Sequence, residues 1–172
     1  MPRSAVYKNI MRKKPNILLT DDEDTFRNIM AKELTRMGYN VVSCASGSET
    51  INTLHERDFD VVILDMNMPV MGGIETLKRV KEMEPTTEVI VLTGQGSIES
   101  AVQAIKSGAY DYLTKPCRLS ELDALLQKAL EKRQLNRENA HLRRLVKGIG
   151  KTPVLSGNSM AMNTLYKMID KE

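Results

Sequence analysis

The sequence has few aromatic residues, only two cysteines and no long apolar run. Aromatic residues make up 4% of the 172 residues and tryptophan is absent, so we expect an aliphatic core in which the eleven methionines fill gaps. No stretch is long enough for a membrane span and the first residues contain no apolar signal core, so no membrane association is expected. Cys44 and Cys117 have neither metal-binding nor redox spacing, which favours a reducing, cytoplasmic location.

The charges are distributed unevenly along the chain. Residues 1–14 hold five basic and no acidic residues, residues 15–117 hold nine basic and sixteen acidic ones, and residues 118–151 hold nine basic and four acidic ones. We therefore expect a flexible basic leader over residues 1–14, an acidic body and a basic linker. No direct contact with nucleic acid is expected, because the linker mixes both charges and lacks interleaved aromatic residues; a solvated helix face explains it better.

Apolar strand patterns alternate with amphipathic helix patterns over residues 15–130. Expected strands span residues 16–20, 41–44, 61–65, 88–93 and 110–114. Expected helices span residues 24–37, a short segment from Ser46 or Ser48, residues 74–83, residues 97–107 with Ser97 as N-cap, and a long segment from about residue 120. This alternation predicts an α/β fold with a doubly wound parallel sheet in the flavodoxin-like order 2-1-3-4-5. No G-x-G-x-x-G follows the first strand, which argues against a dinucleotide site.

Polar residues stand where the expected strands end. The apolar run Val61–Leu64 leads into Asp65, and a turn signal follows directly. Taken by itself, Asp65 is explained as well by a cap of the next helix as by a functional site. Other strands end in a further set of polar residues: Asp21, Asp22, Thr93 and Lys115. In open α/β sheets ligands bind at the edge formed by the carboxyl ends of the strands, so the sequence predicts that these side chains meet at that edge.

Three carboxylates at one edge repel each other, by roughly 4 kcal/mol for a pair at ~4 Å and an effective dielectric constant of ~20. Such a cluster predicts a cation, and an all-oxygen ligand set suits Mg²⁺. A carboxylate beside a metal, a hydroxyl group and a lysine can accept a phosphoryl group as an acyl phosphate.

Four motifs in the same order resemble the receiver domain of two-component response regulators. They are Leu18-Leu19-Thr20-Asp21-Asp22-Glu23, Asp65-x-x-Met68-Pro69-x-Met71-x-Gly73, Thr93-Gly94 and Tyr112-x-x-Lys115-Pro116. The resemblance implies that Asp65 is the phosphoacceptor of a histidine kinase. It also implies a Mg²⁺ site formed by Asp65, by Asp22 directly, by Asp21 mainly through water and by the backbone carbonyl of Asn67.

The resemblance further assigns a switch to the same edge. Thr93 would hydrogen-bond the phosphoryl group, Lys115 would pair with it before a cis Lys115–Pro116 bond, and Tyr112 would turn inward when Thr93 moves. Taken alone, Tyr112 is explained as a half-buried strand residue, Thr93 as a strand-end hydroxyl and Lys115 as a surface lysine. Gly94 stands where the family often has alanine, which keeps the site open. The signal would reach the surface formed by the 97–107 helix, the 110–114 strand and the last helix.

The last helix is expected to continue past the receiver, because residues 120–147 contain no glycine or proline. A stripe of Leu119, Leu122, Leu126 and Ala129 should pack on the receiver. A second stripe, stepping by four, three and four residues, predicts a coiled-coil seam and a homodimer over residues 131–150: Leu135, Asn139, Leu142 and Val146. The alternative is an amphipathic helix that rests on a neighbouring domain.

Residues 151–172 carry a second resemblance. Gly148-Ile149-Gly150-Lys151-Thr152 is not a phosphate loop, because position 145 is leucine and a helix precedes it. Residues 155–162 (LSGNSMAM) resemble the opening of the AAA+ domain of sigma-54-dependent activators, with a helix expected over residues 163–170. This resemblance implies a regulatory, non-enzymatic part of a larger protein, with an AAA+ ATPase domain and sigma-54 RNA polymerase as partners through parts beyond this chain.

Two other classes of function remain open on the sequence. A phosphatase or mutase with an aspartate nucleophile typically has a second acid two residues later, where this sequence has Asn67. A docking module that is never phosphorylated would show no phosphate on Asp65 with any donor.

Overall fold

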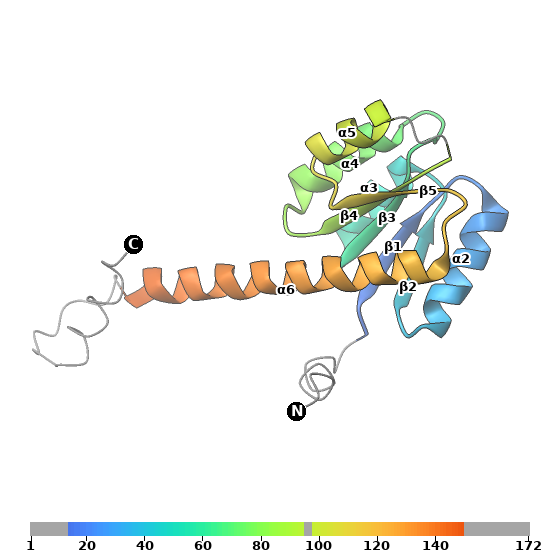
Figure 1. Cartoon of the computed structure of the whole chain (residues 1–172). Helices are drawn as coiled ribbons and strands as arrows, with labels where there is room; N and C mark the ends of the chain where they lie inside the picture. Colours follow the sequence, from blue (N-terminus) through green and yellow to red (C-terminus); the bar gives the residue numbers. More distant parts are fainter. Residues whose placement is uncertain (1–13, 95–97, 150–172) are drawn as a thin grey trace, which may run out of the picture. The chain divides into compact units, whose positions relative to one another are not determined.

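The computed structural model describes residues 14–94 and 98–149, and within them helices alternate with strands (Figure 1). The elements in chain order are β1 (Asn16–Thr20), α2 (Asp24–Arg36), β2 (Asn40–Cys44), α3 (Gly47–Glu56), β3 (Val61–Asp65), α4 (Gly73–Met83), β4 (Glu88–Thr93), α5 (Ile98–Lys106), β5 (Asp111–Thr114) and α6 (Leu119–Ile149). All paired strands are parallel, and their order is β2-β1-β3-β4-β5. The predicted flavodoxin-like fold is confirmed.

The sheet is covered on both faces, with α3, α4 and α5 on one side and α2 and α6 on the other (Figure 1). Alternate residues of the fully buried β3 supply the two cores. Val62 and Leu64 pack into the first cluster, while Val61 and Ile63 pack into the second. A strand sends successive side chains to opposite faces, so a continuous apolar run is what a strand between two helical layers requires.

The element ends agree with the predicted ones to within a residue or two, and local caps explain them. Met37 caps α2, and the following Gly38 adopts φ 101°, the left-handed conformation that glycine accepts most readily. Of the two candidates for the start of α3, Ser46 is the N-cap, because its Oγ accepts the backbone N–H of Glu49 at 3.2 Å. Ser97, the expected N-cap of α5, lies outside the described residues.

The last helix is fastened to the sheet first by apolar and then by ionic contacts. Leu122, Leu126 and Ala129 are fully buried, as the first predicted stripe requires. Beyond them the side chain of Arg133 is buried, with Nε 3.1 Å from Asp60 Oδ1 as an ion pair and Nη1 donating to Thr87 Oγ1 at 2.7 Å. Two outer ion pairs flank it: Lys132–Glu88 at 3.2 Å and Arg137–Asp60 at 3.7 Å.

We call Asp60, Thr87, Glu88, Lys132, Arg133 and Arg137 the ionic clamp. Its partners precede or begin β3 and β4, so it lies at the amino-terminal edge of the sheet, opposite the predicted site. Burial, followed by the nearby charge of Arg137, lowers the pKa of Arg133, while Asp60 raises it. No pattern in the sequence predicted that the charged linker contributes a buried residue.

The chain divides into two compact units, residues 1–137 and 138–172. The described part of the second unit is the end of α6, residues 138–149. Along α6 the expected seam residues Leu135, Leu142 and Val146 are 55%, 57% and 63% exposed, and Asn139 is exposed as well. Leu145, which the predicted seam left out, is 50% exposed. The expected leader (residues 1–13) and AAA+ opening (residues 151–172) lie outside the described residues.

Candidate functional site

The carboxyl ends of the strands bring the predicted residues to one edge of the sheet. Asp21 follows β1 directly, Asp65 ends β3, Thr93 ends β4 and Lys115 follows β5. Since β1, β3, β4 and β5 are consecutive neighbours in the sheet, the four side chains come from adjacent strands. Gly73 lets α4 approach this edge closely: a Cβ there would lie 2.7 Å from the carbonyl oxygen of Asp65.

Three carboxylates form the centre of the site. Asp21, Asp22 and Asp65 each offer an oxygen, and these oxygens lie within 4.8 Å of one another. Asp21 and Asp65 are buried, whereas Asp22 is exposed. Burial raises the pKa of Asp65, and the charge of Asp21 raises it further, while Lys115 and the backbone N–H of Asn67 lower it. A hard divalent cation fits this set of oxygens, of which the exposed Asp22 faces solvent.

Lys115 neutralises the buried pair. Its Nζ donates to Asp21 Oδ2 at 2.5 Å and lies 3.2 Å from Asp65 Oδ1. Burial alone lowers the pKa of Lys115, but the hydrogen bond to Asp21 and the charges of Asp65 and Asp21 outweigh it and raise the pKa overall. The peptide bond to Pro116 is cis, as the resemblance implied. The lysine is therefore a charged member of the site and not a surface lysine.

Two neighbours of Lys115, Asp21 and Phe26, were not predicted from the sequence to contact its side chain. The ring centroid of Phe26 lies 4.3 Å from Lys115 Nζ. Arg27 Nη1 donates to the backbone carbonyl of Asp21 at 2.7 Å, and the backbone N–H of Glu23 donates to Asp21 Oδ1 at 2.9 Å. No motif marked Phe26, because a helix residue with apolar neighbours is normally assigned to the core.

The remaining predicted residues surround this centre in different environments. Thr93 is 3% exposed, whereas Tyr112 is 38% exposed and lies at the surface of β5. Asn67 is exposed, and its Nδ2 would lie 3.9 Å from a Cβ on Gly94, so an alanine at position 94 would fit without a clash. Their individual roles towards a phosphoryl group stay predictions.

The loop after β3 contains a strained residue. Val70 has φ 66° and is fully exposed, and the N–H of Met71 donates to the carbonyl of Pro69 at 2.9 Å across it. This is a γ-turn with a positive φ, a rare arrangement that is costly for a β-branched residue. No side-chain burial compensates the strain, which lies five residues from Asp65.

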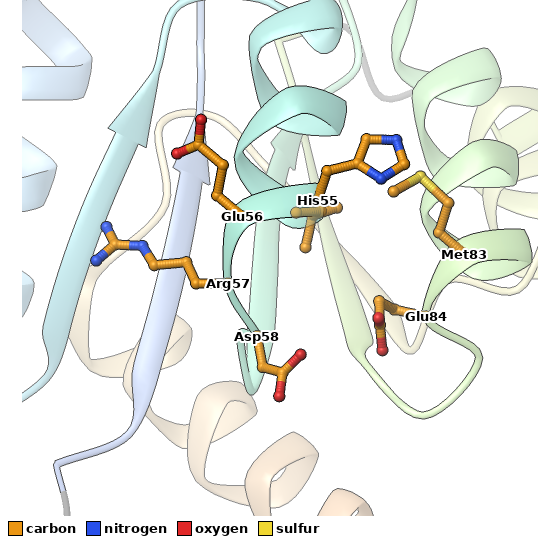
Figure 2. A pocket seen from close by; sticks show the side chains of 7 residues that line it. His55, Glu56, Arg57, Asp58, Met83 and Glu84 are labelled. Atoms are coloured by element: carbon orange, nitrogen blue, oxygen red, sulfur yellow. The ribbon is translucent and has the colours of Figure 1, made fainter.

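A pocket at the opposite edge of the sheet contains none of these residues (Figure 2). It has a volume of about 340 Å³ and lies between the ends of α3 and α4, lined by His55, Arg57, Asp58, Met83 and Glu84 among others. Its charged side chains have both signs, and among the described residues the acidic cluster suited to a metal is the one at Asp65. The pocket is therefore separate from the chemistry of the carboxylates.

The chain is similar to known proteins in sequence and in structure. The family model of the response regulator receiver domain matches residues 17–127. The NtrX-like response regulator of Rickettsia felis is 37% identical over 155 residues, covering 89% of this chain and 32% of the relative. The transcriptional regulatory protein ZraR of Escherichia coli O157:H7 is 42% identical over 115 residues, covering 67% of this chain and 26% of the relative. The chain thus spans about a third or less of the length of these relatives.

Solved structures give the same result. A receiver domain from Clostridium thermocellum has a TM-score of 0.68 at 34% identity, covering 70% of this chain and 98% of that one. NtrX from Brucella abortus has a TM-score of 0.72 at 30% identity and covers 91% of this chain but 34% of its own. Within the described residues, no helix combines the length and apolar character that a membrane crossing needs.

Proposed function

Because this chain belongs to the response regulator receiver domain family, we propose that it is a phosphorylation switch in which Asp65 accepts a phosphoryl group from a histidine kinase. The observation that carries the proposal is the buried Asp21–Asp65 pair bridged by Lys115 at the carboxyl edge of the sheet. A nucleophilic carboxylate with a fixed cation beside it is the arrangement that acyl phosphate formation requires.

The proposed reaction is a displacement at phosphorus. An oxygen of Asp65 attacks the phosphorus atom of the kinase phosphohistidine, the P–N bond breaks, and the imidazole leaves with the bonding electron pair. Lys115, 3.2 Å from Asp65, balances the negative charge of the phosphoryl oxygens. Asp21, Asp22, Asp65 and the carbonyl of Asn67 would hold Mg²⁺, which supplies further charge neutralisation when bound.

Thr93, with Gly94 beside it, and Tyr112 are the proposed link between this reaction and the surface. The phosphoryl group would add charge and acceptors next to Thr93, and Tyr112, which is 38% exposed on β5, would turn inward in response. On the same side, α5 exposes a stripe at helical spacing, with Ile98 84%, Val102 45% and Ile105 44% exposed. We assign this stripe, with β5 and α6, to the homodimer contact that responds to phosphorylation.

We further propose that residues 131–150 form a dimeric coiled coil that carries the signal to an AAA+ ATPase of the sigma-54 activator class, beginning near residue 151. The likeness to NtrX and ZraR supports this class, and so do the exposed seam residues of α6. The domain borders at residues 15, 130 and 150 belong to the same proposal. Kinase, AAA+ ATPase and sigma-54 RNA polymerase are the partners it implies.

Labelling with a small phosphodonor tests the phosphoacceptor. With Mg²⁺ present, the wild-type chain should take up one phosphoryl group, Asp65→Asn none, and the exposed control Asp58→Asn as much as wild type. Full labelling of Asp65→Asn would refute the assignment. Steady release of phosphate from a phosphomonoester, without a kinase, would favour a phosphatase instead.

Sedimentation tests the seam. Leu135→Asp combined with Leu142→Asp places two carboxylates in the proposed interface and should give monomers at micromolar concentration with the receiver still folded. Asn139→Leu should keep or strengthen association while loosening the choice between dimer and higher states. An unchanged dimer mass in the double variant would place the contact elsewhere than on Leu135, Asn139, Leu142 and Val146.

A further inference from the structure

Phe26 is an aromatic side chain in contact with the charged centre of the site. It stands in the first turn of α2, and its ring centroid lies 4.3 Å from Lys115 Nζ, well within the distance at which a ring face attracts an ammonium group. The ring is half-buried and packs against the core on the α2 and α6 side of the sheet. Lys115 therefore touches two carboxylates and one aromatic ring.

The first turn of α2 is tied to the residue that the lysine binds. Arg27 Nη1 donates to the carbonyl oxygen of Asp21 at 2.7 Å, and the N–H of Glu23 donates to Asp21 Oδ1 at 2.9 Å. Arg27 also pairs with Asp24 at the start of the helix. These bonds link the residues on both sides of Phe26 to Asp21, the residue whose carboxylate also accepts from Lys115 Nζ.

A lysine needs such a support. Its four-carbon chain loses rotamer freedom when it is ordered and its ammonium is strongly hydrated, so a contact in addition to the carboxylates helps to hold it in the site. The side chain of Lys115 is 18% exposed, so part of it is in contact with solvent. The face of the Phe26 ring offers the ammonium an attractive contact in place of solvent.

We propose that Phe26 is a positioning residue that holds the Lys115 ammonium between Asp21 and Asp65, in place for the incoming phosphoryl group. This deepens the proposed function and depends on it for its role in the reaction, while the contact between ring and ammonium can be tested without any phosphorylation. The contact should be worth about a 2-fold to 30-fold change in equilibrium, the range of a partly desolvated cation–π pair.

A double-mutant cycle in metal-free buffer tests the contact. Urea unfolding is measured for wild type, Phe26→Leu, Lys115→Met and the double variant, with Phe26→Tyr as the matched control that keeps the ring. Phe26→Leu should change the unfolding equilibrium constant by at least 2-fold more when Lys115 is present than when methionine replaces it. Phe26→Tyr should keep this coupling. Equal effects of Phe26→Leu in both backgrounds would overturn the proposal.

The rate of labelling by a small phosphodonor tests the role in the reaction. Phe26→Leu should be labelled about 2-fold to 30-fold more slowly than wild type, Phe26→Tyr at close to the wild-type rate, and the loss should vanish in the Lys115→Met background. The labelling rates are compared among folded proteins, so this test needs no measurement of unfolding. Coupling in unfolding together with an unchanged labelling rate would remove Phe26 from the reaction. If no variant and not even wild type is labelled, the proposed function fails, and the unfolding cycle alone decides the contact.

Discussion

Lys115→Met is the substitution that most directly probes the electrostatics of the site. Methionine keeps much of the length and apolar stem of the lysine but removes the ammonium that Asp21 and Asp65 share. Two buried carboxylates, 0% and 5% exposed in their side chains, are then left within 4.8 Å of each other without a compensating charge. The variant therefore converts a balanced cluster into a repulsive one.

The magnitude follows from the distances. At an effective dielectric constant of ~20, the pairs at 2.5 Å and 3.2 Å are worth roughly 7 and 5 kcal/mol before desolvation is counted. Removing one partner of a buried ion pair costs about 3–5 kcal/mol after desolvation. Since the Lys115 side chain is 18% exposed, solvent screens part of the interaction, and we expect a net loss of about 3 kcal/mol.

The loss should depend on pH and on Mg²⁺. The pKa of Asp65 is already raised by burial and lies higher still without Lys115, which lowers it in the wild type. A folded pKa above the unfolded value of 3.8 means that the folded state takes up the proton first, so the stability deficit should shrink as the pH falls from about 7 towards 4. Millimolar Mg²⁺ should raise the melting temperature of Lys115→Met more than that of wild type.

Thermal and urea unfolding with and without Mg²⁺ measure these effects, with the exposed Lys78→Met as control. The control should stay within about 0.5 kcal/mol of wild type at every pH. A Lys115→Met variant as stable as the control in metal-free buffer at pH 7, or one whose deficit grows on acidification, would show that the ion pairs do not balance the cluster.

Three further substitutions test other parts of the fold by urea unfolding. Gly73→Ala should lose about 1–3 kcal/mol, because the new methyl group would lie 2.7 Å from backbone atoms; wild-type stability would contradict this close approach. Val70→Gly should gain about 1 kcal/mol by removing strain at φ 66°, and a loss would count against the γ-turn. Asp60→Ala should lose about 3 kcal/mol because it leaves the buried guanidinium of Arg133 without its carboxylate partner, whereas Arg133→Met should be nearly neutral. A larger loss for Arg133→Met than for Asp60→Ala would contradict this account of the ionic clamp.

The sheet and its carboxylate edge could be predicted because their signals are local in the sequence. Val61–Leu64 is apolar at every position, and only a strand between two helical layers buries both of its faces. Strict alternation with helices then fixes parallel pairing, and parallel strands bring Asp21, Asp65 and Lys115 to one edge. The approximate placement of these residues therefore needed no knowledge of side-chain contacts.

The contacts themselves depend on residues distant in sequence and could not be predicted in this way. Arg133 looks like one more charge of a solvated linker, and only the folded chain brings it to Asp60, 73 positions earlier. Phe26 fits an apolar helix stripe equally well with or without an ammonium group over its ring. Val70 carries no turn signal of its own, since its positive φ is imposed by the loop around it. The spacing of apolar residues shows which face of a helix or strand is buried, but it does not show which distant side chains lie in contact.

The position of the ionic clamp has a consequence for how this chain can change by mutation. Strand β4 runs from Glu88 in the clamp to Thr93 at the site, five steps of about 3.3 Å or roughly 16 Å, through wholly buried aliphatic residues. Substitutions that far apart and without shared partners combine additively. Charge substitutions in the ionic clamp can therefore strengthen or weaken the attachment of α6 without changing the carboxylate site at the other edge. The stability of this attachment and the chemistry of the site are thus open to separate selection.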